Sequence, residues 1–107
     1  MSWKRWLPAY DVPKKIERLV NAGILKDKTS ERDVVPHFET SLPDGSQMVM
    51  WVDHPDISAR VMPEGPRYGI EIYRKDQLPE TVFSSNDLQE ALISLQDVLR
   101  QYGLESL

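Results

Sequence analysis

The most constraining feature of this sequence is an apolar stripe close to its C-terminus. Apolar and aromatic residues recur there at helical spacing, and the polar residues between them fall on the other side of the same helix. The stripe consists of Leu88, Ala91, Leu92, Leu95, Val98, Leu99 and Tyr102. Asn86 and Gln89 predict a capping box at its start, and Gly103 predicts its end. Such a helix needs an apolar surface to pack on, and the rest of the chain must supply one.

A second helix is predicted over residues 12–22. Val12, Ile16 and Leu19 recur at helical spacing, while charged residues occupy the other side. Asp11 is the expected N-cap, and Gly23 fits the left-handed position that ends a helix. The charged residues 26–33 then read as a polar connection.

The segment between the two predicted helices carries the signals of antiparallel strands. Residues 34–42 and 47–52 flank Pro43-Asp44-Gly45-Ser46, and Asp-Gly between two extended runs predicts a tight hairpin. A second hairpin is predicted from residues 57–62 and 67–74, around a cluster of turn residues. Residues 81–83 predict a short fifth strand. Residues 47–52 lack alternation, which predicts an interior strand buried on both faces.

These elements predict one α+β domain over residues 1–107, with residues 1–10 as a candidate N-terminal arm. The sheet is expected to have about four strands in two hairpins, with the C-terminal amphipathic helix packed on it. The chain has no cysteine, which excludes disulfides, thiolate metal sites and cysteine nucleophiles. No apolar run is long enough for a membrane span, and residues 1–11 lack the apolar segment of a secretion signal. We therefore expect a cytoplasmic protein.

The main candidates for chemistry are His37 and His54, and the register of the first hairpin decides whether they meet. If residue 42 pairs with residue 47, the two imidazoles are diagonal neighbours on one face of the sheet. If residue 42 pairs with residue 46 instead, His37 faces Trp51 and His54 points to the opposite face. A slip of one residue thus creates or removes a site.

The first register would give two histidines and a carboxylate, from Glu39, Asp53 or Asp56, which is a ligand set of metal-dependent enzymes. The spacing matches no established metal motif. In addition, Asp53-His54-Pro55-Asp56 has the composition of an ordinary turn. The sequence therefore predicts no cofactor, no metal and no catalytic residue, and it favours a non-catalytic protein over a small His/Asp enzyme.

Charge is distributed unevenly along the chain. Residues 1–32 carry eight Lys or Arg against four acids, a net charge of +4, whereas residues 33–107 carry five against thirteen, a net charge of −8. Such a distribution orients a protein toward a charged partner. The acidic part favours a partner protein with a basic surface.

The favoured function is therefore a small interaction module that binds another protein. The sheet face that the helices leave uncovered is the expected contact surface, with Glu39, Arg60, Glu71 and Tyr73 as candidates, because arginines and aromatics dominate contact energies. The same face would serve a homodimer. The alternative is nucleic-acid binding through the aromatic and basic residues Trp3, Lys4, Arg5 and Trp6 together with the first helix.

Overall fold

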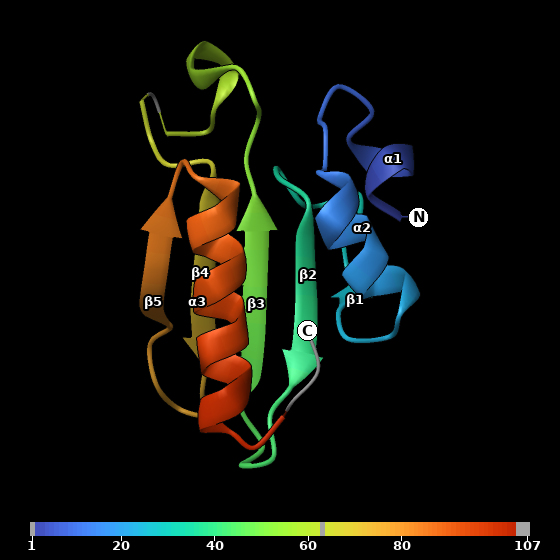
Figure 1. The fold of residues 1–107 in the computed structure, drawn as a ribbon. Helices are drawn as coiled ribbons and strands as arrows, with labels where there is room; N and C mark the ends of the chain where they lie inside the picture. Colours follow the sequence, from blue (N-terminus) through green and yellow to red (C-terminus); the bar gives the residue numbers. More distant parts are fainter. Residues whose placement is uncertain (1, 63, 105–107) are drawn as a thin grey trace.

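The computed structural model describes residues 2–62 and 64–104 and shows an α+β fold (Figure 1). The helices are α1 (Ser2–Trp6), α2 (Lys14–Asn21) and α3 (Leu88–Gln101), and a short 3₁₀ helix, η1, spans Ile57–Ala59. The strands are β1 (Lys26–Asp27), β2 (His37–Ser41), β3 (Gln47–Val52), β4 (Tyr68–Tyr73) and β5 (Glu80–Ser85). The predicted fold class is confirmed, including the C-terminal amphipathic helix packed on an antiparallel sheet.

The sheet is a simple meander in the order β1-β2-β3-β4-β5, with every pair antiparallel. The turn between β2 and β3 lies at the predicted Asp-Gly signal, where Gly45 has a φ of +90°. The Leu42 N–H donates a hydrogen bond to the Ser46 carbonyl at 2.9 Å, and the register then pairs His37 with Trp51. The structure therefore has the second of the two registers considered from the sequence.

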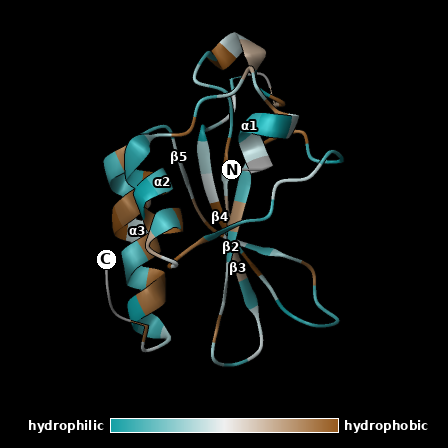
Figure 2. Ribbon diagram, turned by 90° about the vertical axis from the view of Figure 1, so that its right-hand side faces the viewer, coloured by the Kyte–Doolittle hydropathy of each residue, from teal (hydrophilic) through white to brown (hydrophobic). Residues whose placement is uncertain are grey.

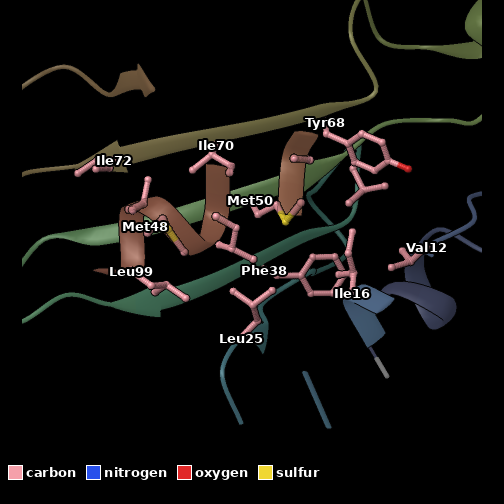
Figure 3. Packing of buried hydrophobic residues seen from close by; sticks show 14 of the residues in the cluster. Val12, Ile16, Leu25, Phe38, Met48, Met50, Tyr68, Ile70, Ile72 and Leu99 are labelled. Carbon is pink, nitrogen blue, oxygen red and sulfur yellow. The ribbon is translucent and has the colours of Figure 1, made fainter. Parts of the chain in front are cut away.

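Both α2 and α3 lie on the same side of the sheet (Figure 2). Their apolar residues meet one face of the strands in a continuous core (Figure 3), in which Phe38, Met50 and Ile70 are completely buried. From the helices, Ile16 and Leu95 are also completely buried in this core. The stripe predicted from the sequence is thus the surface that joins α3 to the sheet.

The central strand β3 corrects one expectation. It is an interior strand, but it does alternate: Met48, Met50 and Val52 are buried on the helix side, whereas Val49 and Trp51 are only half-buried on the other side. An uninterrupted apolar run hides this alternation, because hydrophobicity alone does not distinguish a core position from an uncovered face.

Residues 57–62 are the clearest error in the sequence-based assignment of strands. They form η1 and irregular backbone. Strand β4 is paired with β3, and a long loop, described for residues 53–62 and 64–67, connects the two strands. The short strand β1, which lies in the segment expected to be a polar connection, extends the sheet beyond β2. At the other edge, β5 runs from Glu80 to Ser85, longer than the predicted 81–83.

The C-terminal end of α2 lies where its glycine predicted it, whereas the N-cap residues of α2 and α3 differ from the predicted ones. Gly23 has a φ of +80° and ends α2 as expected. At the start of α2, however, Pro13 rather than Asp11 occupies the N-cap position, and no side chain caps the helix. The N-cap of α3 is Asp87, whose carboxylate accepts hydrogen bonds from the N–H groups of Gln89 and Glu90. Asn86 was the wrong choice by one residue.

Candidate interaction surface

The sheet face opposite α2 and α3, called the open face below, presents alternate residues of three long strands. The register arranges them in rows across the sheet: His37, Trp51 and Gly69 form one row, and Glu39, Val49 and Glu71 form the next. A third row contains Ser41, Gln47 and Tyr73. The open face therefore changes from aromatic and apolar at one end to acidic and polar at the other.

The indole of Trp51 lies over Gly69, its neighbour on β4. A Cβ atom placed on Gly69 would come within 1.9 Å of the indole ring, so no larger residue fits while the ring stays there. Glycine on β4 thus lets the indole lie over the backbone, and Trp51 as a whole is half-buried on the open face.

Beside Trp51 lies a hollow of about 370 Å³, called the apolar hollow below. Its lining residues are Val34, Val35, Trp51, Asp53, Val61, Met62, Pro66, Thr81 and Ser84. Val34 and Met62 are 62% and 68% exposed. Single exposed apolar residues are ordinary, but several around one depression mark a surface suited to contact with another molecule.

A second hollow, of about 410 Å³, opens at the next rows of the open face and is called the acidic hollow below. It is lined by Asp33, His37, Glu39, Gln47, Val49 and Tyr73. The imidazole of His37 lies between two carboxylates, with Nδ1 3.2 Å from Asp33 Oδ2 and Nε2 2.9 Å from Glu39 Oε2. Only the protonated imidazole can donate hydrogen bonds to both.

Tyr73 and Glu71 complete the acidic end of the open face. The Tyr73 hydroxyl lies 3.5 Å from Glu71 Oε1. Partial burial raises the pKa of Tyr73 above its ordinary value, and the charges of Glu71 and Glu39 raise it further. Lys26 is the cross-strand neighbour of Glu39 on β1, but no ion pair joins them in the described part of the chain.

The loop between β3 and β4 contributes Asp53, Val61, Met62 and Pro66 to the apolar hollow, and Arg60 holds this loop together. Its guanidinium donates hydrogen bonds to the carbonyl oxygens of His54, Pro55 and Gly65 and to the Asn86 side chain. Of the four contact residues predicted on the sheet, Glu39, Glu71 and Tyr73 lie on the open face. Arg60 lies in the loop instead, where it acts on the shape of the hollow.

The structure places the two histidines apart. His37 is on the open face opposite Trp51, as the observed register requires, whereas His54 follows β3 and packs edge-on against Tyr10, with ring centroids 5.2 Å apart. Residues 53–56 leave the strand as irregular backbone with a bend at residues 55–56, where the composition favoured a turn: buried Asp53 accepts a hydrogen bond from the His54 N–H, and Asp56 accepts one from the Ser58 N–H. This geometry removes the two-histidine site.

The aromatic and basic residues near the N-terminus are divided between core and surface. Trp3 in α1 is 4% exposed, and its backbone N–H donates a hydrogen bond to Asp27 Oδ2 on the edge strand β1 at 3.1 Å. Trp6 is exposed, and the Arg5 guanidinium lies 4.7 Å from the centre of its ring. Lys4 is exposed beside Trp3. These residues are remote in sequence from both hollows.

No protein-family model, curated protein or solved structure matches this chain. Among residues 2–62 and 64–104, no helix is both long and apolar enough to cross a membrane. Within the same residues, no three side chains of histidine, aspartate or glutamate are grouped so that they could hold a metal ion. The function is therefore inferred from the surface itself.

Sequence reasoning missed the apolar hollow. Its residues come from a loop before β2, from β3, from the 53–67 loop and from β5, and no local pattern connects these segments. One signal was present: Gly69 interrupts a strand of otherwise bulky residues, which marks a place where a neighbouring group lies close to the backbone.

Proposed function

We propose that this protein is a non-catalytic interaction module that binds another protein through the open face of its sheet. The observation that carries this proposal is the apolar hollow beside half-buried Trp51, on the face that α2 and α3 do not cover. Protein interfaces commonly have an apolar, aromatic centre and a polar rim. The open face has both components side by side: the apolar hollow with Trp51, and the acidic hollow next to it.

The position of the exposed apolar residues supports the same function. Val34 and Met62 contribute to the hollow but belong to no part of the buried core. Tryptophan and tyrosine are enriched among the residues that dominate binding energies, and the open face presents one of each, Trp51 and Tyr73. A partner side chain that enters the apolar hollow would remove water from Val34, Met62 and Trp51 together.

The alternative proposal is nucleic-acid binding through α1 and α2. Arg5 and exposed Trp6 offer one cation and one ring for stacking. Burial of Trp3 leaves this surface with less aromatic area than the sequence suggested, so we rank it second.

The test is capture of partners from a lysate of the source cell by the full chain, followed by reconstitution with the purified partner. Three proteins are immobilised in parallel: the parent, the double variant Val34→Glu/Met62→Glu, and the control Leu78→Glu. Leu78 is 90% exposed in the turn before β5 and lines neither hollow. All captures are repeated with nuclease and at high salt.

We expect a protein that binds directly to the parent and to the Leu78→Glu control. This binding should persist after nuclease treatment and at high salt, and it should be absent with the double variant. Equal binding to all three proteins, or none to the parent, would exclude the open face as the contact surface. Capture that disappears with nuclease and at high salt would favour the nucleic-acid alternative. Self-association of the purified parent that the double variant abolishes would identify the partner as a second copy.

A further inference from the structure

We infer that the open face recognises a protein segment carrying an apolar side chain and, close to it in sequence, a lysine or arginine. The apolar side chain enters the apolar hollow, and the cation enters the acidic hollow. This inference rests on the proposed function, and it adds the chemistry of the partner.

The two hollows are neighbours on one continuous surface. Trp51 lines the apolar hollow and Val49 lines the acidic one. They are two positions apart on β3, which separates them by about 7 Å along the strand. His37, the cross-strand partner of Trp51, also lines the acidic hollow. One short segment can therefore contact both hollows at once.

Charge complementarity determines the sign of the partner. Asp33 and Glu39 line the acidic hollow, and Glu71 lies beside Val49 at its edge. Nearby positive groups are His37, when protonated, and Lys26 on β1. The three carboxylates outnumber these positive groups, so a cationic group of the partner is favoured over an anionic one.

The walls of the acidic hollow suit the long side chain of lysine or arginine in particular. Val49 offers an apolar surface for the methylene stem. Tyr73 is 43% exposed and lines the same hollow, and a cation that reaches the face of its ring would gain a further electrostatic contribution. A bare metal ion would lack such complementary contacts, whereas a basic side chain uses carboxylates, ring and stem together.

The experiment uses a phage library of random peptides selected on the parent protein, with each enriched peptide then synthesised. Binding of each peptide is measured by calorimetry to the parent, to the apolar variant Val34→Glu/Met62→Glu, and to the neutralised variant Glu39→Gln/Glu71→Gln. The matched control is Glu17→Gln/Asp97→Asn, which makes the same change in net charge on α2 and α3.

We expect enriched peptides to contain an apolar residue near a lysine or arginine. Their affinity should fall about tenfold in Glu39→Gln/Glu71→Gln and little in the control, and high salt should shrink this difference. Replacing the basic residue of the peptide by glutamate should weaken binding to the parent to a similar extent.

The outcomes separate this inference from the proposed function. Enriched peptides that require Val34 and Met62 but contain no basic residue would overturn the inference and leave the proposed interaction surface standing. Equal affinity for Glu39→Gln/Glu71→Gln and for the control Glu17→Gln/Asp97→Asn would do the same. If no peptide is enriched, or the enriched peptides are indifferent to the apolar variant, the inference fails. The lysate capture, which uses whole partner proteins, then decides independently whether the proposed function fails with it.

Discussion

The two faces of strands β2, β3 and β4 are built from the same segments, yet they differ in what their residues do. On the helix side, Phe38, Met50 and Ile70 are completely buried against α2 and α3. On the open side, Trp51 and Val49 are half-buried beside charged neighbours. The alternation of a strand thus divides one sequence into a set that holds the fold and a set available for recognition. The two sets should respond differently to substitution.

The largest effect is expected for Phe38→Ala, on the helix side of the sheet. Phe38 is completely buried at the centre of the core, so its truncation should lower the free energy of unfolding by about 3–5 kcal/mol. Urea unfolding followed by circular dichroism measures this change. A pair of equal size on β3 compares Val52→Ala, completely buried on the helix side, with Val49→Ala on the open side, which we expect to cost less than half as much. Equal costs would mean that the open face contributes to folding as the core does.

The second effect concerns the contact between Gly69 and Trp51. In Gly69→Ala, the new methyl group would occupy the position of the indole, so Trp51 must move, and we expect a loss of about 1–3 kcal/mol. Gly69→Ala should cost less in a Trp51→Ala background than in the parent, because no ring remains to displace. An equal cost in both backgrounds would show that the ring does not lie on Gly69 in solution.

The third effect falls on the wall of the apolar hollow. Arg60→Met keeps an apolar stem but removes the hydrogen bonds to the His54 and Gly65 carbonyls, so we expect a cost of about 1–2 kcal/mol. Hydrogen exchange should become faster within residues 53–67 and stay unchanged in β2 and β3. Faster exchange throughout the sheet would mean that the loop and the core open as one unit.

These comparisons also explain how far the sequence could be interpreted. The α3 stripe, the Asp44-Gly45 turn and the end of α2 at Gly23 were predictable, because each depends on residues close together in the chain. The structure of residues 57–62 was not, because the turn residues around it suit a hairpin as well as they suit the long loop that Arg60 holds. The separation of His37 from His54 depended on a single step in register, which the sequence left open.

The candidate surface was only partly predictable for the same reason. Glu39, Glu71 and Tyr73 followed from simple alternation and do lie on the open face. The apolar hollow is formed where segments distant in sequence come together beside Trp51, and such contacts leave no local sequence pattern. Arg60 was expected to contact a partner, but its hydrogen bonds within the loop appear only in three dimensions.

A smaller effect on stability separates binding from folding. Val34→Glu/Met62→Glu changes two exposed side chains outside the core, so each substitution should alter the free energy of unfolding by less than about 0.5 kcal/mol. Thermal and urea unfolding check this directly, with Leu78→Glu as control. A cooperative unfolding transition close to that of the parent, together with lost partner binding, would confirm that the open face serves recognition. A large loss of stability would instead assign these residues to the fold.

The smallest effect tests the acidic end of the open face without any partner. Glu71 is the nearest carboxylate to the Tyr73 hydroxyl and helps to raise the pKa of Tyr73 above its ordinary value of 10.0. Negative charge disfavours the phenolate, so Glu71→Gln should lower this pKa, while burial, the largest cause, should keep it above the ordinary value. Titration of tyrosine by NMR in the parent, in Glu71→Gln and in Glu17→Gln measures the difference. An unchanged pKa in Glu71→Gln would place the carboxylate too far away to help bind a cation. A lowered pKa would confirm that the charge gathers where the basic side chain of a partner is expected, and binding of a basic peptide should then lower the Tyr73 pKa further.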